Sequence, residues 1–166
     1  MDTIEDIRGS AGTLERRVVD RLIEKNYHIS FAESCTAGMA AARLVNVPDA
    51  SKVLDVSVIT YANEAKMKYL GVSKESIESY GVVSEEVAKQ MAKGAASLMG
   101  AEVGVGISGI AGPSGGVPGK PVGTVCFGFY INGKVYSFTE HFGNPGRNYV
   151  RDESVTFVYE KLIELL

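Results

Sequence analysis

The sequence has few of the residues that build metal centres and disulfide frameworks. Its 166 residues include two cysteines, Cys35 and Cys126, and two histidines, His28 and His141. Two widely separated cysteines indicate neither a zinc cluster nor a disulfide framework, and a reducing cytoplasm is the compartment that fits this usage. Two histidines also leave little material for a Ser-His-Asp triad. We therefore expect a chemistry that uses neither a metal nor another cofactor.

The sequence also lacks an excess of basic charge and a long apolar run. The formal net charge is -3 and the pI is about 5.5, so no basic face indicates nucleic acid or an anionic membrane. No stretch approaches the roughly 18 apolar residues of a membrane span. No charged and apolar leader opens the sequence. We expect no nucleic-acid partner, no membrane partner and a cytoplasmic location.

The most informative stretch runs from Phe31 to Gly38. Residues 28–32 alternate polar and apolar side chains as a strand does, and apolar residues from 39 onward recur at helical spacing. Ser34 therefore lies at a strand-to-helix turn, where Thr36 is the expected N-cap residue of the helix. Unpaired backbone N–H groups of such a turn can stabilise an oxyanion, so Ser34 is a candidate nucleophile. The alternative is that this turn only caps a helix.

Two later stretches, residues 60–66 and 106–113, also follow apolar, strand-like runs. In an open α/β sheet such strand ends converge on one crevice, so the three turns can build one site. Asn63 is the expected N-cap of a short helix, which puts Lys66 at its N3 position. The helix dipole opposes a cation in the first turn, so we expect a lowered pKa for Lys66, as a general base requires.

Residues 104–123, which include a Gly- and Pro-rich run at 109–123, resemble nucleotide-binding motifs in glycine spacing but lack the structural context that these motifs require. Residues 104–109 have the glycine spacing of a dinucleotide fingerprint, but they lie inside an expected strand. The next carboxylate after Glu102 is Glu140, too far along to bind a ribose. A phosphate-loop match at Gly119-Lys120 lacks the first glycine and the Ser/Thr. We interpret the run as a non-helical active-site loop, with a simple surface loop as the alternative.

The C-terminal third predicts a hairpin followed by a helix. Residues 122–131 and 134–142 are joined by Asn132-Gly133, so two antiparallel strands finish a sheet that begins in βα style. The last helix begins with Arg147 and Arg151, one turn apart on one face. Cations at a helix start are locally unfavourable, which indicates an anionic partner. The alternative is that the two arginines form ion pairs with Asp152 or Glu153 in solvent.

Four motifs together resemble the CinA C-terminal domain family, the nicotinamide-nucleotide amidohydrolases also called NMN deamidases. Glu33–Gly38 is similar to Glu-Ser-Cys-Thr-Gly-Gly, and Tyr61–Lys66 to Tyr-Ser/Ala-Asn-Glu-x-Lys. Gly109–Pro113 with Lys120–Val125 is similar to Gly-Ile-Ala-Gly-Pro followed by Lys-Pro-Val-Gly-Thr-Val, and Arg147–Arg151 to Arg-x-x-x-Arg. The resemblance covers nearly the whole chain. It departs from the family at three positions, which are Ala37 for glycine, Ser108 for threonine and Gly146 for aspartate.

The resemblance implies hydrolysis of the carboxamide of nicotinamide mononucleotide (NMN) to nicotinic acid mononucleotide and ammonia. It implies an α/β fold, a three-layer α/β/α sandwich with a mixed, mostly parallel sheet that ends in the antiparallel hairpin. We expect one domain over residues 1–166, with 1–12 as a flexible lead-in, and a homo-oligomer. The expected catalytic residues are Ser34, Tyr61 and Lys66. The expected substrate-binding residues are Thr36, Gly38, Ser108, Gly109, Gly112, Arg147 and Arg151.

The sequence leaves two points of mechanism and one of function open. Either Lys66 as a neutral amine, or Tyr61 with a phenolic pKa lowered by Lys66, can take the proton of Ser34. A second hypothesis makes Cys35 the nucleophile and His141 its base. A third is a catalytically silent adaptor or ligand-sensing domain that keeps the pocket.

Overall fold

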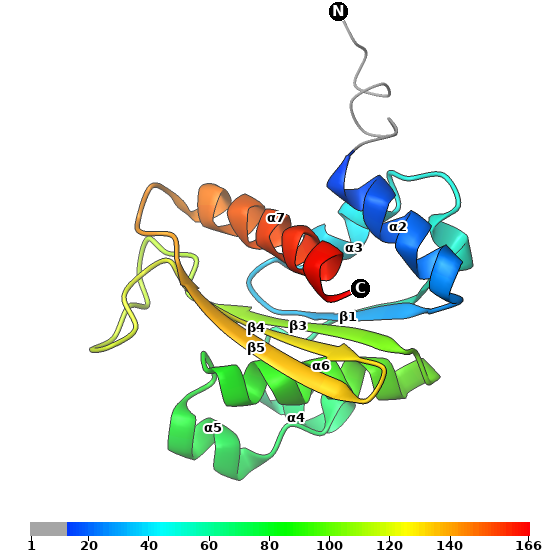
Figure 1. Ribbon diagram of the computed structural model, residues 1–166. Coiled ribbons are helices and arrows are strands. Elements are labelled where there is room, and N and C mark those ends of the chain that lie inside the picture. Colours follow the sequence, from blue (N-terminus) through cyan, green and yellow to red (C-terminus); the bar gives the residue numbers. More distant parts are fainter. Residues whose placement is uncertain (1–12) are drawn as a thin grey trace, which may run out of the picture.

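The computed structural model describes residues 13–166, which form an open five-stranded sheet between two layers of helices (Figure 1). The expected lead-in over residues 1–12 lies outside the described residues. In chain order the elements are α2 (Leu14–Lys25), β1 (Ile29–Glu33), α3 (Met39–Leu44), η1 (Ala50–Lys52), β2 (Leu54–Ile59), α4 (Asn63–Leu70), α5 (Lys74–Tyr80), α6 (Glu85–Met99), β3 (Val103–Gly109), β4 (Thr124–Ile131), β5 (Lys134–His141) and α7 (Arg147–Leu165).

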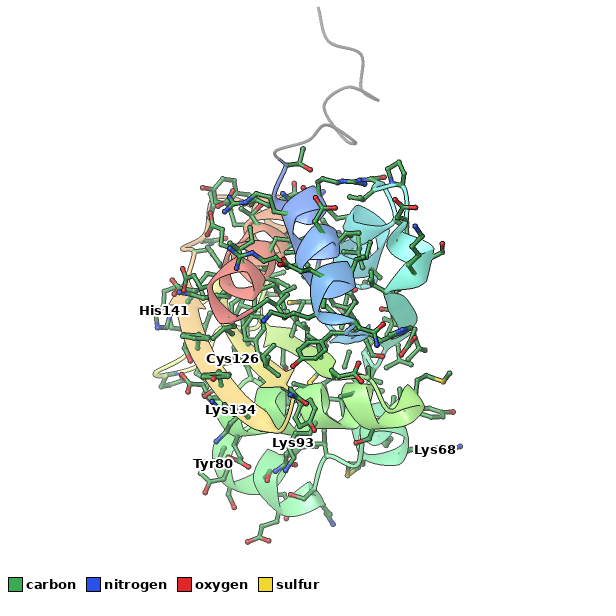
Figure 2. All side chains as sticks on the ribbon, turned by 45° about the vertical axis from the view of Figure 1, so that its right-hand side comes forward. Lys68, Tyr80, Lys93, Cys126, Lys134 and His141 are labelled. Atoms are coloured by element: carbon green, nitrogen blue, oxygen red, sulfur yellow. The ribbon has the colours of Figure 1, made fainter. Side chains whose placement is uncertain are left out.

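The sheet has the strand order β2-β1-β3-β4-β5. Strand β1 pairs in parallel with β2 and with β3, whereas β3–β4 and β4–β5 pair antiparallel, so two of the four pairings are parallel. Helices α2, α3 and α7 cover one face, and α4, α5 and α6 cover the other (Figure 1). Lys68, Tyr80 and Lys93 mark the second helical layer in Figure 2. The predicted three-layer α/β/α sandwich with a mixed sheet and a C-terminal hairpin is confirmed.

Strand β1 lies between β2 and β3 and leads directly into the turn with Ser34. All five of its residues are buried, including Ser30 and Glu33. Phe31 packs with residues of α2, α3 and α7, and Ala32 packs with residues of α4 and α6, because successive side chains point to opposite faces. The polar and apolar alternation in the sequence therefore predicted the strand correctly but did not mark a solvent-exposed face. Parallel strands covered on both faces are buried along their whole length.

Three helices begin at a residue whose side chain caps the helix. Thr13, Ser73 and Ser84 cap α2, α5 and α6, each accepting a hydrogen bond from a backbone N–H three residues on. The hairpin turn has positive φ at Asn132 (44°) and Gly133 (91°), as a tight two-residue connection requires. The structure departs from the predicted helix ends at α3 and α4, the two helices that build the candidate site.

Helix α6 packs directly on the sheet because the strand residues beneath it include glycines, which have no side chain to separate the helix from the sheet. A Cβ atom added to Gly104 would lie 2.0 Å from the carbonyl oxygen of Ala92, and one added to Gly106 would lie 2.3 Å from that of Ala88. At Gly128 on β4 the same Ala88 oxygen would be 2.1 Å away. These glycines therefore let the backbone of α6 lie directly against the sheet.

We expect Gly128→Ala to lower the free energy of unfolding by roughly 2–3 kcal/mol, because the added methyl group overlaps a helix backbone that cannot retreat without losing its own packing. Gly119→Ala is the control. Its φ is +80°, but nothing lies within 4 Å of an added Cβ, so only the backbone strain of about 1 kcal/mol is expected there. Urea unfolding of the two variants measures the difference, and equal losses would contradict this account of the α6 packing.

Candidate active site

The three predicted turns lie together at one edge of the sheet. Because β1, β2 and β3 run parallel, the segments that follow their carboxyl ends meet on the same side. They enclose an open cavity of about 290 Å³. The cavity is lined by Ser34, Cys35, Tyr61, Asn63, Lys66, Val82, Val83, Ser108, Gly109, Ile110, Ala111, Gly112, Ser114, Gly115 and Arg147.

The amine of Lys66 lies beside the hydroxyl of Ser34. Lys66 Nζ is 2.6 Å from the carbonyl oxygen of Thr60, 3.2 Å from that of Tyr61 and 3.2 Å from Ser34 Oγ. A neutral amine has two N–H donors and one lone pair. With the two carbonyl oxygens accepting the donors, the lone pair is left for the proton of Ser34. The geometry suits proton abstraction from the serine.

Burial lowers the pKa of Lys66 below its ordinary value of 10.5, and Cys35 exerts a smaller opposing effect. The side chain is 0% exposed, so its charged form loses hydration that the two carbonyl dipoles replace only in part. The predicted direction agrees with this finding, but the predicted Asn63 cap and N3 position were wrong. Ala62 is the N-cap of α4 and Asn63 is its first residue, so Lys66 lies at N4 with its own N–H bonded to Ala62.

Tyr61 contributes two different groups to the site. Its carbonyl oxygen binds Lys66 Nζ, as described above, while its phenol accepts a 2.9 Å hydrogen bond from Arg147 Nη2. The side chain is 59% exposed. Within residues 13–166 no hydrogen bond joins the phenol to Ser34 or to Lys66. The geometry therefore favours Lys66 over Tyr61 as the immediate base.

A buried carboxylate, Glu33, organises the turn that carries Ser34. Its side chain is 0% exposed and accepts hydrogen bonds from the N–H groups of Gly38 (3.0 Å), Ala40 (3.1 Å) and Ala41 (3.1 Å). The Thr36 hydroxyl donates to the same carboxylate at 2.7 Å. The prediction that Thr36 is the N-cap was wrong, because Gly38 is the N-cap and Glu33 satisfies the donors at the start of α3.

The two arginines of α7 use their guanidinium groups differently. Arg147 lines the cavity, where Nη1 donates to the carbonyl oxygen of Gly112 at 2.7 Å while Nη2 binds the Tyr61 phenol. Arg151 Nε donates to the carbonyl oxygen of Cys35 at 2.9 Å, and Nη2 is 3.4 Å from that of Thr36. Neither arginine forms a salt bridge within the described part of the chain.

Cys35 is poorly placed to act as a nucleophile. Its side chain is 5% exposed, and burial raises the pKa of the thiol to about 11, so the reactive thiolate is disfavoured. His141, the base in the cysteine hypothesis, is the last residue of the edge strand β5 (Figure 2). Its Nδ1 is 3.1 Å from Thr124 Oγ1. His141 does not belong to the cavity lining.

Comparison with known proteins identifies the family of this fold and site. The model of the CinA C-terminal domain family matches residues 11–166. The chain belongs to this family. A Clostridium tetani protein named competence-damage inducible is 46% identical over 166 residues, covering 96% of this chain and 40% of that protein. A Kosmotoga olearia protein named CinA-like is 46% identical over 148 residues, covering 89% of this chain and 36% of that protein.

A solved structure supports the same assignment. The competence/damage inducible protein CihA of Agrobacterium tumefaciens matches with a TM-score of 0.88 and 38% sequence identity. The match covers 92% of this chain and 93% of that one. The chain thus spans nearly all of the solved CinA protein but only about two fifths of the length of the curated relatives above.

The cavity of this CinA domain brings together most of the residues singled out in the sequence. Its lining includes Ser34, Tyr61, Lys66, Ser108, Gly109, Gly112 and Arg147, and it leaves out Thr36, Gly38 and Arg151. The Ser108 hydroxyl donates to the carbonyl oxygen of Val82 at 2.8 Å, so it holds the neighbouring wall of the cavity. Within residues 13–166 no group of three or more His, Cys, Asp or Glu side chains is placed to hold a metal ion. None of the described helices is long and apolar enough to cross a membrane.

Sequence reasoning missed the role of Glu33. The signal was an acidic residue at the end of an otherwise buried strand, directly before a run of small residues, since a buried carboxylate needs donors and the N–H groups of the following turn are the nearest ones. Ala37 also has a structural meaning. Its φ of 47° lies in the left-handed region, where the family's glycine is unstrained.

Proposed function

We propose that this CinA domain hydrolyses the carboxamide of nicotinamide mononucleotide to nicotinic acid mononucleotide and ammonia, with Ser34 as the nucleophile. The observation that carries the proposal is the buried Lys66 amine 3.2 Å from Ser34 Oγ, held by two carbonyl oxygens. Serine is a weak nucleophile unless a neighbouring base takes its proton. A lysine kept uncharged by burial is such a base.

The reaction proceeds through an acyl-enzyme. Lys66 takes the proton of Ser34 while Ser34 Oγ attacks the carboxamide carbon, and the negative charge that develops on the amide oxygen is stabilised by backbone N–H groups. The donor proposed for this role is the backbone N–H of Cys35, because this residue directly follows Ser34 and lines the cavity. The Lys66 ammonium then protonates the leaving nitrogen, which departs as ammonia. A water molecule, deprotonated by Lys66, cleaves the ester and releases the acid.

The substrate's phosphate requires a cation near the cavity, and Arg147 provides one. Its guanidinium lies in the cavity wall beside the glycine-rich segment 109–112, whose backbone offers further donors. Arg147→Gln is expected to raise the KM for the mononucleotide by about tenfold to a hundredfold, the effect of losing a charge-assisted hydrogen bond. Its effect on nicotinamide riboside, which has no phosphate, is expected to be much smaller. An equal increase in KM for both substrates would show that Arg147 does not bind the phosphate.

The direct test is ammonia release from nicotinamide mononucleotide by the purified chain, with chromatographic detection of nicotinic acid mononucleotide. The expected result is one ammonia for each acid formed. Tight binding of the nucleotide with no ammonia would favour the ligand-sensing alternative. Neither binding nor turnover would show that the substrate assignment is wrong.

A further inference from the structure

The cavity beside Ser34 has two chemically different ends. The segment between α5 and α6 contributes Val82 and Val83 to its lining, and the segment after β3 contributes Ile110. Arg147, the first residue of α7, also belongs to the lining. Helices α5 and α6 cover one face of the sheet and α7 covers the other (Figure 1). The cavity therefore joins apolar side chains on one side of the sheet to a cation on the other.

The three apolar residues Val82, Val83 and Ile110 form what we call the apolar wall. Val83 is buried and packs with Ala88 of α6 and Cys126 of β4, while Val82 and Ile110 are half-buried and pack against this cluster. The wall is thus backed by a helix and a strand, so the fold sets its shape. Small-molecule sites typically combine such an apolar surface with a few polar groups.

Ser108 ties the apolar wall to the strand beside the nucleophile. The Ser34 N–H donates to the carbonyl oxygen of Ile107 at 3.1 Å, so β3 runs next to the start of the turn. Ile107 packs with residues of α2, α3 and α7, so the next side chain, Ser108, points to the opposite face. There its hydroxyl donates to the carbonyl oxygen of Val82 at 2.8 Å. This bond joins the wall to the neighbour of Ser34.

The proposed base comes from the same side of the sheet as the apolar wall. Lys66 belongs to α4, which covers the same face as α6 (Figure 1), and its amine is 3.2 Å from Ser34 Oγ. The carboxamide of NMN is bonded directly to the pyridine ring, so the ring must find a surface close to these two residues. The ring carries a positive charge, which an uncharged Lys66 does not repel.

The charges of the substrate assign its two ends to the two ends of the cavity. Arg147 attracts the anionic phosphate and repels the positively charged ring. Tyr61 offers an aromatic surface in the lining, but its phenol accepts a hydrogen bond from Arg147 at 2.9 Å, so a ring stacked there would lie beside that cation. Within residues 13–166 the cavity lining includes no carboxylate that would attract the ring. The apolar wall is the surface left for it.

We propose that the pyridine ring of NMN binds against the apolar wall and that its phosphate binds at Arg147, with the carboxamide at Ser34. The proposal rests on the amide hydrolysis proposed above and deepens it by naming the ring subsite. Ser108 is then a positioning residue, because its hydroxyl holds the backbone of Val82 and touches no reacting atom. Threonine, the family's residue at this position, supplies the same hydroxyl.

Intermolecular NOE measurements locate the ring directly. Ser34→Ala, which is expected to bind NMN without cleaving it, is labelled uniformly with carbon-13 and saturated with unlabelled NMN. We expect cross-peaks from the pyridine protons to the methyl groups of Val82, which are identified by their loss in Val82→Ala. Cross-peaks from the pyridine protons to the ring of Tyr61, with none to Val82, would overturn the proposal.

Affinities in the Ser34→Ala background give a second test. Val82→Ala is expected to weaken binding of NMN and of nicotinamide riboside by the same factor, about threefold to tenfold, because both ligands carry the ring. Arg147→Gln is expected to weaken binding of NMN alone. Val45→Ala, at a position that is 57% exposed at the end of α3 and outside the cavity lining, is expected to bind both ligands unchanged. Unchanged affinities in Val82→Ala would contradict the ring subsite.

The positioning role of Ser108 is tested by rescue. Ser108→Ala is expected to lower kcat/KM for NMN by about fivefold to tenfold, the effect of losing one hydrogen bond. Ser108→Thr keeps the hydroxyl and is expected to stay within about threefold of the wild type. Thermal unfolding confirms that both variants are folded, and equal losses in the two would show that the hydroxyl has no such role.

The outcomes separate the ring subsite from the proposed reaction. If the wild type releases ammonia from NMN and the pyridine protons show no cross-peak to the apolar wall, the reaction stands and the ring subsite alone is wrong. If the wild type releases no ammonia and Ser34→Ala does not bind NMN, both proposals fail.

Discussion

Ser34→Ala is expected to release ammonia from nicotinamide mononucleotide on the order of a thousandfold more slowly than the wild type, or slower still. The variant loses the atom that forms the acyl-enzyme, while the cavity, Lys66 and the backbone N–H of Cys35 stay in place. The KM is expected to change little, because the hydroxyl acts in the transition state. Steady-state ammonia release, with product identified by chromatography, measures the loss.

Cys35→Ser is the matched control for this experiment. It replaces the adjacent thiol by a hydroxyl of similar size, and it is expected to keep activity within about threefold of the wild type, since a buried thiol of raised pKa takes no part in the chemistry. Loss of activity in Cys35→Ser, together with an active Ser34→Ala, would reverse the assignment and make Cys35 the nucleophile.

Lys66→Met is expected to lower kcat by on the order of a hundredfold or more. Methionine has a similar length and fills the same buried space, so the change removes the base and leaves the cavity shape. The pH profile gives the more specific result. In the wild type kcat/KM is expected to rise with pH as Lys66 loses its proton, and this rise begins below the ordinary lysine value of 10.5 because burial lowers the pKa of Lys66. In Lys66→Met the rise is expected to disappear.

Tyr61→Phe is the control for the identity of the base. It keeps the carbonyl oxygen that binds Lys66 and removes only the phenol, so it is expected to retain the pH-dependent rise. If the rise persists in Lys66→Met and is lost in Tyr61→Phe, the phenol is the base and Lys66 is not.

The lowered pKa of Lys66 also predicts how stability depends on pH. The unfolded chain holds the lysine proton up to the ordinary pKa of 10.5, whereas the folded chain releases it at lower pH. Between the two pKa values the unfolded state binds more protons, so the wild type gains stability relative to Lys66→Met as the pH rises through that window. Thermal unfolding across this range measures the difference. A constant gap between the two proteins would show that Lys66 is not perturbed.

The sequence predicted the fold well because the residues that start helices and turns lie where the folded structure needs them. Ser73 and Ser84 are strong N-caps, Asn132-Gly133 is a strong hairpin turn, and parallel strands place their following turns at one edge of the sheet. The starts of α3 and α4 were less predictable. Caps were expected at Thr36 and Asn63, but both helices begin without a side-chain cap, at the N-cap residues Gly38 and Ala62.

The candidate site was predictable as a set of residues but not as a set of contacts. Two of the three predicted turns contain Ser34, Tyr61 and Lys66. The contact of Arg151 with the Cys35 carbonyl joins residues 116 positions apart in the sequence, so it depends on how α7 packs against the fold. No local pattern encodes such a long-range contact. The burial that lowers the pKa of Lys66 likewise depends on tertiary packing and not on a local pattern.

The central claim of this account is that Lys66 is an uncharged base beside Ser34, and NMR titration of the lysine side chains tests it most directly. Carbon-13 labelling at Cε reports the charge of each lysine, and the signal missing from Lys66→Met identifies Lys66. We expect the Lys66 signal to titrate below the ordinary value of 10.5 and to match the rise of kcat/KM with pH. A Lys66 signal that stays charged throughout the pH range in which the wild type is active would contradict the account.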